Sequence, residues 1–544
     1  MTIRITSSLF VFAILSACPA IAQTSSFEKV VPAPLLSFDA FARAAQVAPD
    51  QGRCVFATNA LIGQLGDADV LMLRVNGAGD IVQSLTIGDT TGQGYHDVAK
   101  EVVQSDKHYY VSGYTRAIDT SAAHTFTAFL IKVDTALNFK WQKNYILPGQ
   151  EMYAEVMTPI GGSDLLVAGK IYDGNDFQSF LMRTDSTGAV QWIKQYQMPF
   201  GETIQCVRPL PGGDLLLSGS MIFGFELVLP FVCKVTAQGD WIWGKYYNYP
   251  PMSIVENSSF LFVRAASVND ILLAGHTDVF GAGSLDAYVV NIDSSGAINW
   301  ARTYGGSQFD LPYAVQFDVA ENELVMAGNS GSFTSSGTPH AMAMRIDAGG
   351  ALLATALYGD TATLQQAALY HGSRIAQDQR LLMGARFFPA DDLYITGTDD
   401  LLTNACNHHP VSASMIAQTT SFGGFAATVT VPEPTVTNDE LGHGVYIDGT
   451  MLCLPPTAVN APAGAADHPL LYPSPGDGDF RVDLPAGSNA VAIQLLDMEG
   501  RVVWRAGSVN AEVRIPGTIV NGHYVVSIED ANGERTVLRY ALQR

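Results

Sequence analysis

Cations are scarce in this sequence. It contains 30 Lys and Arg against 52 Asp and Glu among 544 residues, which gives a formal net charge of −22. Binding to a nucleic acid backbone needs clustered cations that release counterions, and an anionic membrane surface attracts the same side chains. The composition therefore argues against nucleic acid and anionic membrane as partners.

Cysteine and long apolar runs are also rare. The six cysteines show no Cys-x-x-Cys or mixed Cys and His spacing of the kind that predicts a zinc site. Cys54, Cys206 and Cys233 lie in apolar strand patterns and are interpreted as core residues. Cys406 and Cys453 flank an irregular segment and are candidates for a disulfide in an oxidising compartment. No stretch beyond the N-terminal region has about 18 consecutive apolar residues, so no transmembrane span is expected.

Residues 1–22 have the pattern of a secretory signal peptide. Arg4 supplies the positive start, Leu9–Ala17 the apolar segment, and Ala20–Ala22 a small-residue cleavage site. The alternative is a lipoprotein signal acylated at Cys18, which Pro19 disfavours. We expect a mature chain that begins at Gln23 and a protein that is secreted or displayed on the outer cell surface.

A repeat of roughly 50 to 58 residues organises most of the remaining chain. In five copies a Gly stands three positions after the first residue of a turn, as Gly188 follows Asp185. Aromatic residues follow at seven and eleven positions after that first residue. They are Trp141, Trp192, Trp243 and Trp300 at the first position, and Tyr145, Tyr196, Tyr247, Tyr304 and Tyr358 at the second.

Each repeat predicts four short strands, as the copy near residue 300 shows. Ile271–Gly275 is an apolar strand that ends in Gly, Ala287–Asp293 is the next strand, and Trp300–Tyr304 returns after a hairpin turn at Gly296. Because side chains alternate along a strand, Trp300 and Tyr304 share one face. We expect both rings to fill the gap between neighbouring sheets.

Seven copies of a four-stranded unit are typical of a seven-bladed β-propeller, which we assign to residues 23–405. Phe27–Val31 aligns with the strand Trp300–Tyr304, while the last copy, at Leu393–Asp399, lacks its returning strand. We expect Phe27–Val31 to complete that last unit and close the ring, which would remove an exposed sheet edge. The alternative is an unpaired N-terminal arm.

The segment from Asp286 to Gly306 resembles the bacterial seven-bladed propeller repeats known as SBBP. The resemblance covers about residues 25–400. It implies the propeller fold and an extracellular or surface setting, and it does not itself imply a catalytic activity.

The C-terminal part has a different pattern. Residues 406–466 are interpreted as a linker with some strand content, and residues 467–544 as a separate domain. In that domain Tyr472–Pro475, Leu495–Val503 and Gly522–Val526 resemble the type A sorting domain of cargo exported by type IX secretion. The resemblance implies the type IX secretion machinery of a Bacteroidota-type bacterium as a partner. The strand pattern predicts a small β-sandwich, for which an Ig-like adhesion module is the alternative.

The predicted fold class is therefore all-β: a seven-bladed β-propeller followed by a small C-terminal β-sandwich domain.

None of the common catalytic or ligand-binding motifs occurs in the sequence. The chain has no Gly-x-Ser-x-Gly, no His-Glu-x-x-His, no phosphate-binding loop and no complete EF-hand loop. His408 and His409 are interpreted as exposed loop residues rather than metal ligands. The paired acids 391–392 and 399–400 could serve glycoside chemistry only if the fold brought them together. No catalytic, cofactor-binding or metal-binding residue is predicted, and no cofactor.

The predicted function is a non-catalytic binding or adhesion scaffold. Loops on a rigid frame carry recognition, and the copies differ most at Tyr114–Phe126, Ile222–Pro230 and Val279–Leu285. These loops are the candidate contact surface for a glycan or protein ligand. The alternative is an extracellular polysaccharide hydrolase or lyase with its site at the propeller channel. Buried, mutually close carboxyl groups with raised pKa at the channel mouth would favour the alternative.

Overall fold

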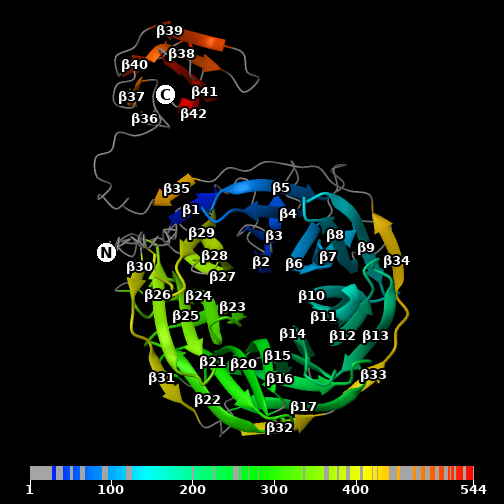
Figure 1. Ribbon diagram of the computed structural model, residues 1–544. Coiled ribbons are helices and arrows are strands. Elements are labelled where there is room, and N and C mark those ends of the chain that lie inside the picture. The colour runs from blue at the N-terminus through cyan, green and yellow to red at the C-terminus, as the bar shows by residue number, and fades with distance from the viewer. Residues whose placement is uncertain are drawn as a thin grey trace, which may run out of the picture. The chain divides into compact units, whose positions relative to one another are not determined.

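The computed structural model divides the chain into two compact units, Met1–Pro456 and Thr457–Arg544 (Figure 1). In the first unit it describes residues 27–31, 41–48, 53–61, 68–88, 96–117, 125–198, 201–223, 227–248, 256–257, 259–267, 269–279, 281–334, 337–359, 367–376, 379–386, 392–404, 408–418, 421–425, 427–439 and 450–453. In the second unit it describes residues 470–472, 479–483, 490–496, 502–507, 512–514, 516, 518–519, 522–530 and 535–542. The signal at residues 1–22 and the Cys406–Cys453 pairing lie outside the described residues.

The first unit is all-β, as predicted, and its described residues form seven antiparallel sheets. The copy near residue 300 forms β19 (Ser259–Ser267), β20 (Asp270–Thr277), β21 (Asp286–Ile292) and β22 (Ile298–Gly305), in this order across the sheet. The next strand, β23 (Asp310–Asp318), opens the following sheet. The three strands named for this copy from the sequence correspond to β20, β21 and β22.

The other sheets repeat this order. They are β2 (Phe41–Ala48), β3 (Arg53–Leu61), β4 (Ala68–Val75) and β5 (Ile81–Ile87); β6 (His96–Ser105), β7 (His108–Ala117), β8 (Thr125–Asp134) and β9 (Phe139–Ile146); β10 (Glu151–Ile160), β11 (Asp164–Tyr172), β12 (Phe177–Thr184) and β13 (Val190–Gln197); β14 (Gly201–Pro209), β15 (Leu215–Phe223), β16 (Leu227–Val235) and β17 (Trp241–Asn248); β23, β24 (Glu323–Ser330), β25 (His340–Asp347) and β26 (Leu352–Tyr358); and β27 (Ala367–Ala376), β28 (Gln379–Arg386), β29 (Asp392–Thr398) and β1 (Phe27–Val31). A short 3-10 turn, η1 (Gly161–Ser163), joins β10 to β11, and β18 (Glu256–Asn257) lies parallel to β16.

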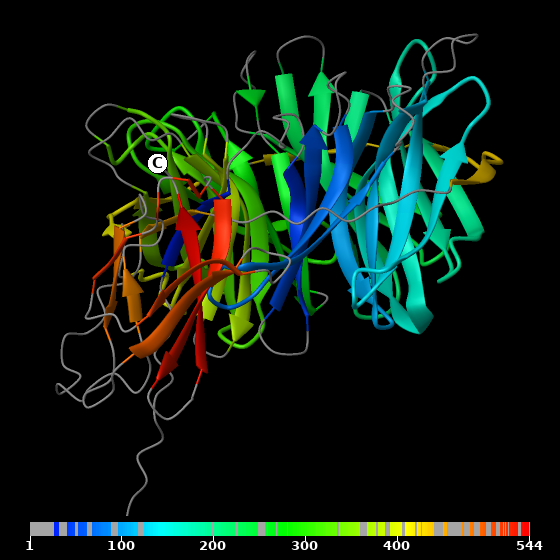
Figure 2. The ribbon, with the colours of Figure 1, turned by 90° about the horizontal axis from the view of Figure 1, so that it is seen from above.

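These sheets stand side by side around a common centre, with β6, β10, β14 and β23 on the inside (Figure 1). The view turned by 90° shows that the strands of this unit run roughly along the axis of the ring (Figure 2). Each sheet therefore presents its faces to its two neighbours. Buried apolar residues of adjacent sheets form the core clusters between them.

The N-terminal strand completes the last sheet of the repeat, as expected from the alignment. β1 pairs antiparallel with β29, with Phe27 opposite Gly397 and Val31 opposite Leu393. The ring of Phe27 lies against Gly79, because a Cβ on that glycine would come within 2.1 Å of it. The pairing joins residues about 370 positions apart.

The turn that begins each outer strand has the predicted chemistry. In the second and third units along the chain the residue three positions after the acid adopts a positive φ, which is +77° at Gly188 and +55° at Leu137. Asp185 Oδ1 accepts the N–H groups of Thr187 (2.8 Å) and Ala189 (3.0 Å). The turn is thus fixed by its own carboxylate.

The tyrosines of the repeat are the residues that join one sheet to the next. Each hydroxyl donates to the carbonyl of the positive-φ residue in the following turn: Tyr145 to Gly188 (2.8 Å), Tyr196 to Gly239 (2.7 Å), Tyr247 to Gly296 (3.1 Å), Tyr304 to Gly350 (2.7 Å) and Tyr358 to Leu402 (2.7 Å). All five side chains are buried. In the last sheet Tyr394, which lies in the third strand and not at the position of these five tyrosines, donates its hydroxyl to the carboxylate of Glu28.

The tryptophans pack against the clusters between sheets, as expected, but are less deeply buried than the tyrosines. Trp141, Trp192, Trp243 and Trp300 are only half-buried. A Cβ on Gly188 would lie 3.0 Å from Trp141, so the indole packs under the turn of the next sheet. The turn is itself at the surface, and it therefore covers only part of the ring.

We predict that Tyr196→Phe destabilises the protein by about 1–3 kcal/mol, because it leaves the buried Gly239 carbonyl without its donor. Tyr172→Phe is the matched control, since the Tyr172 hydroxyl donates to an exposed carbonyl, that of Gly174, at 3.1 Å. The control should change stability by less than about 0.5 kcal/mol. Denaturant unfolding of both variants measures the difference, and equal losses would contradict the role assigned to the tyrosine.

The predicted strands that end in Gly continue beyond it, which corrects the sequence interpretation. β11 passes through Gly169 to Tyr172, and Gly169 lies opposite a bulge in β10 whose extra residue is Glu155. A Cβ on Gly169 would lie 1.9 Å from the carbonyl oxygen of Tyr153. The glycine is needed for this close approach of two strands and not to end a strand.

The same bulge recurs in the first strand of other sheets. The extra residues are Lys100 in β6, Gln205 in β14, Leu261 in β19 and Tyr313 in β23. The facing glycines are Gly113, Gly219, Gly275 and Gly328, where a Cβ would meet a backbone oxygen at 1.8–2.0 Å.

We predict that Gly169→Ala costs about 3 kcal/mol or more, because backbone atoms must move to admit the methyl group. Gly161→Ala is the control, since a Cβ there meets no atom within 4 Å. Thermal unfolding of both variants tests the contrast. A Gly169→Ala protein as stable as the control would show that the bulge does not constrain this position.

The segment after the repeats runs back around the outside of the ring as a belt of short strands, which we call the outer belt (Figure 1). It comprises β30 (His408–Pro410), β31 (Ser414–Ala417), β32 (Ser421–Phe425), β33 (Thr428–Thr430), β34 (Thr435–Asp439) and β35 (Thr450–Cys453). These strands pair in turn with β26, β22, β17, β13, β9 and β1. The segment 406–466, which was expected to be a linker, is therefore split between the units. Its residues up to Pro456 belong to the first unit, and those from Thr457 belong to the second.

The second unit contains two small antiparallel sheets. One is formed by β36 (Leu470–Tyr472), β37 (Asp479–Asp483) and β40 (Glu512–Arg514), and the other by β39 (Val502–Gly507), β38 (Ala490–Leu496), β41 (Gly522–Asp530) and β42 (Arg535–Leu542). Ile493, Leu495 and Val526 are buried in the larger sheet. Across the described parts of both units, no helix has the length and apolar character needed to span a membrane.

Candidate functional site

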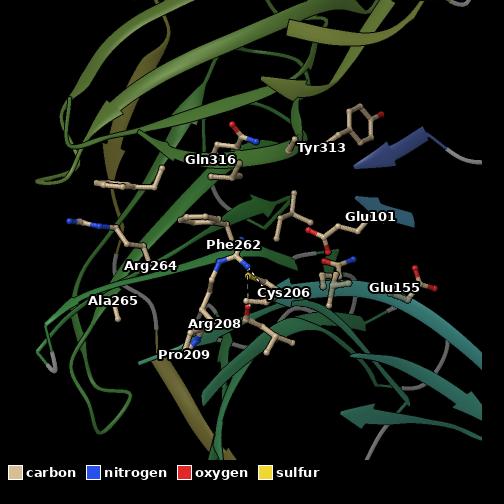
Figure 3. A pocket seen from close by; sticks show the side chains of 18 of the residues that line it. Glu101, Glu155, Cys206, Arg208, Pro209, Phe262, Arg264, Ala265, Tyr313 and Gln316 are labelled. Carbon is tan, nitrogen blue, oxygen red and sulfur yellow. Dashed lines mark hydrogen bonds between the residues drawn. The ribbon is translucent and has the colours of Figure 1, made fainter. Parts of the chain in front are cut away.

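Five neighbouring innermost strands, β6, β10, β14, β19 and β23, line a cavity of about 600 Å³ (Figure 3). A bulge re-aims the side chain of its extra residue. Four of the bulge residues, Glu155, Gln205, Leu261 and Tyr313, line this cavity. The repeated backbone feature thus places a different side chain from each sheet at the same level of the ring.

Two arginines lie on one side of the cavity. Arg208 Nη1 donates to Thr158 Oγ1 (2.8 Å) and to the Val207 carbonyl (3.0 Å), and its guanidinium lies 5.7 Å from the centre of the Phe262 ring (Figure 3). The guanidinium of Arg264 lies 3.7 Å from the ring centre of Phe317. Among the described residues, neither arginine forms an ion pair. Both are therefore held by rings and neutral acceptors, with charge available to a ligand.

Two glutamates lie on the other side. Glu101 Oε2 accepts the backbone N–H of Met157 at 2.6 Å. Glu155 lies 3.5 Å from the ammonium of Lys100 and 3.7 Å from that of Lys170. Each carboxylate is thus already engaged by a donor or a cation.

This arrangement suits recognition of hydroxyl and carboxyl groups. Planar polar side chains such as Arg208, Glu101 and Gln205 can form paired hydrogen bonds, and Phe262, with the other rings of the wall, offers apolar contact. No three His, Cys, Asp or Glu side chains gather as a metal site in the part of the chain that the structure describes. The cavity walls are therefore those of a ligand pocket built from fixed polar groups.

A second cluster of acids lies outside the cavity, where β21 and β23 begin. Asp286 Oδ2 accepts the N–H groups of Ala282 (2.5 Å) and Gly283 (3.2 Å). Asp310 accepts bonds from the hydroxyls of Ser330 (2.5 Å) and Ser332 (2.6 Å). The two carboxyl groups fasten three neighbouring connections to one another.

The two carboxyl groups are close and buried. A Cβ on Gly305 would lie 1.9 Å from Asp286 Oδ1 and 2.8 Å from Asp310 Oδ2, so these oxygens are within about 4.7 Å, the sum of the two distances. Asp286 is 1% exposed and Asp310 is 0% exposed. Burial, and to a smaller extent the Asp310 charge, raises the pKa of Asp286 to about 6. Burial also raises the pKa of Asp310.

The pair satisfies part of the condition that would favour a hydrolase, namely proximity, burial and raised pKa. Neither residue lines the cavity, and neither reaches solvent. A similar acid, Glu202 at the start of β14, has its pKa raised by burial to about 8 and accepts the N–H of Ser179 at 2.9 Å. These acids hold connections together and do not face a substrate.

We predict that Asp286→Asn makes the protein more resistant to alkaline destabilisation. The folded pKa of Asp286 lies near 6 and the unfolded pKa near 3.9. Stability is thus intact below about pH 4 and falls as pH rises through 6, because the unfolded chain ionises first. Between pH 5 and 8 the variant should gain on the order of 1–2 kcal/mol over wild type.

Denaturant unfolding at the two pH values provides the measurement. Asp173→Asn is the control, because hydrogen bonds from Asp176 and Asn175 lower the pKa of Asp173 and keep it ionised in both states over this range. A pH-independent difference for Asp286→Asn would contradict the assignment.

Asp399, one of the acids singled out from the sequence, accepts at Oδ1 the N–H groups of Leu401 (2.9 Å) and Thr403 (2.7 Å) and so caps a turn. Asp391 lies outside the described residues. His408 and His409 lie in β30, not in the loop expected for them, because this segment pairs with β26. The ends of the Tyr114–Phe126 loop are described, whereas residues 118–124 lie outside the described residues.

The cavity residues were not identified from the sequence. Cys206 and Cys233 are buried, as predicted for core residues, yet Cys206 also borders the cavity. One feature of the sequence could have indicated them. In the strand that precedes each glycine-containing strand, the central residues vary between copies, whereas the glycine that faces them recurs.

Comparison with known proteins gives little further guidance. No family model matches the chain, and no curated protein matches it. Among solved structures, the extracellular domain of the putative hybrid two-component system BT4673 from B. thetaiotaomicron is 9% identical, covers 95% of this chain and 100% of its own, and has a TM-score of 0.18. A structure described as that of the putative one-component system BT4673 is 8% identical, covers 96% of this chain and 98% of its own, and has the same TM-score of 0.18. At this score the two folds do not superpose, so neither the fold nor the role of those domains transfers to this chain.

Proposed function

We propose that this protein is a secreted or cell-surface ligand-binding scaffold. Its first unit is a seven-bladed β-propeller whose central cavity, with the adjoining ends of the blades, holds a ligand without catalysing a reaction. The single observation that carries the proposal is the cavity of about 600 Å³, whose polar side chains come from five different sheets. A rigid frame with variable inward side chains is the arrangement that pre-organises binding.

Three structural features support the propeller. The seven sheets follow one another around a centre, tyrosine hydroxyls join consecutive sheets, and β1 pairs with β29. Four-stranded sheets repeated radially with their edges protected are the defining features of this fold.

The second unit is proposed to direct export. The motifs in residues 467–544 resemble the sorting domain of type IX secretion cargo. Two small antiparallel sheets within one compact unit support a β-sandwich. Together with the signal pattern at residues 1–22, this supports a location of the first unit outside the cell.

Binding is favoured over hydrolysis by the state of the acids. Glu101 is bonded to a backbone N–H, Glu155 is shared by two lysines, and the close pair Asp286 and Asp310 is buried away from the cavity. A general acid needs a protonated carboxyl within reach of the substrate. A polysaccharide hydrolase or lyase is therefore the second candidate, supported only by the proximity and raised pKa of the buried pair.

The proposal predicts binding without turnover. The mature chain, residues 23–544, is applied to a glycan array, and each bound glycan is then incubated with excess protein and assayed for new reducing ends and unsaturated sugars. We expect saturable binding and no product. Product formation at a rate that follows protein concentration would show that the protein is an enzyme.

A variant pair locates the site. Arg208→Gln should weaken binding about tenfold or more, as expected for a central anchor. Arg302→Gln is the matched control, because Arg302 also stacks on a ring, that of Trp300 at 4.9 Å, but does not line the cavity. Equal affinities of both variants would place the ligand elsewhere.

A further inference from the structure

Aromatic side chains gather at one end of two adjacent sheets, β6–β9 and β10–β13. Tyr114 and Phe126 lie with ring centres 5.6 Å apart, and Tyr153 lies 4.9 Å from the first and 5.0 Å from the second. Tyr172 and Phe177 form a second pair at 4.9 Å. These five residues, the aromatic patch, are partly exposed, and Phe177 is 41% exposed.

Cations lie directly on the rings of the aromatic patch. Lys170 Nζ is 5.2 Å from the ring centre of Tyr153 and 5.2 Å from that of Phe177, so it joins the two groups of rings. Lys100 Nζ is 5.5 Å from the Tyr114 ring, and the Arg116 guanidinium is 5.7 Å from the Phe126 ring. The strand register builds this arrangement, since Phe126 is the cross-strand partner of Arg116 and Tyr153 is that of Lys170.

Charged side chains of both signs surround the aromatic patch. The cations are Lys100, Arg116 and Lys170, and the acids are Glu151 and Glu155, with Asp173 and Asp176 in the turn that joins Tyr172 to Phe177. Both lysines share the single carboxylate of Glu155 at 3.5 and 3.7 Å. The lysines are thus paired with an acid of the patch, whereas Arg116 is the third cation.

Arg116 has a polar group without a partner. It forms no ion pair among the described residues, and its Nε atom is buried without a hydrogen-bond partner. A guanidinium presents Nε and a terminal nitrogen as a fork that matches the two oxygens of a carboxylate. A ligand carboxylate beside Phe126 would satisfy this orphaned donor.

We infer that the aromatic patch and Arg116 bind an acidic oligosaccharide, with ring faces stacked on sugar C–H surfaces and Arg116 paired with a uronic acid carboxylate. The inference deepens the proposed function and rests on it. Aromatic rings supply rigid contact area at low entropic cost, and their negative faces attract the polarised C–H groups of a pyranose. The patch adjoins the cavity through Glu155, which lines the cavity and contacts both lysines.

The ligands for the test differ only in charge. Binding of the mature chain to tetragalacturonate and tetramannuronate is measured by calorimetry, beside the fully methyl-esterified form of each. We expect at least one uronate to bind, and its methyl ester to bind about tenfold or more weakly. Failure of both uronates to bind, or equal affinity for acid and ester, would overturn the inference.

Variants test the residues. Phe177→Ala should weaken uronate binding about tenfold, and Arg116→Gln should weaken it as much while removing the difference between acid and ester. Ile242→Ala, at a 42% exposed residue of β17, and Arg302→Gln are the controls and should bind as wild type does. If Arg116→Gln weakened acid and ester equally, Arg116 would be a structural residue and the inference would fail.

The two proposals fail in distinguishable ways. If the protein bound a neutral glycan or a protein ligand in a manner sensitive to Arg208→Gln and insensitive to Phe177→Ala and Arg116→Gln, the scaffold function would stand and the acidic-glycan inference would fall. If uronates bound at the patch and were cleaved, the inference would stand and the non-catalytic function would fall.

Discussion

The structure of the first unit depends on one interaction, the hydrogen bond from a buried tyrosine to the turn of the next sheet. The turn needs a residue with positive φ, whose carbonyl then points back toward the preceding sheet, as at Gly239. A lost partner would leave a buried carbonyl unsatisfied, so each bond ties the packing of one sheet to the exact turn of its neighbour. Where the repeat departs from Gly, Leu402 still accepts the Tyr358 hydroxyl with a φ of +67°. Backbone geometry is therefore what the repeat preserves, and the side chain at this position is secondary.

The outer belt solves the problem that such sheets create at their outer edges. An unpaired outer strand would offer backbone N–H and C=O groups to other chains. In six sheets a short belt strand occupies that edge, for example β33 along β13. The belt is exposed even where its residues are apolar, as in Ser414–Ala417, because its strands are held by backbone pairing more than by a core. The protein thus protects its edges with a single crossing segment, and the sheets need no special edge residues of their own.

The sequence predicted the repeated features and missed the unrepeated ones, for physical reasons. Turn acids, glycines and tyrosines recur at fixed spacing, so the strands near residue 300 and the pairing of β1 could be inferred. The half-burial of Trp300 could not, since it depends on how much of the ring the next turn covers. The outer belt was expected only as a linker with some strand content, because its strands are as short as Thr428–Thr430. The cavity depends on bulges that shift side chains by one position, which no alternation pattern indicates.

The contrast between repeated and unrepeated residues explains where function can reside in such a molecule. The bulge residues vary between sheets, from Lys100 and Glu155 to Leu261, while a glycine faces each of these three. Because the facing glycine and the backbone contact fix the strand, the bulged side chain is free to vary at little cost to folding. The aromatic patch follows the same rule at the ends of two sheets. Stability is thus carried by what is common to all copies, and recognition by what distinguishes them, so a site here is identified by its departure from the repeat.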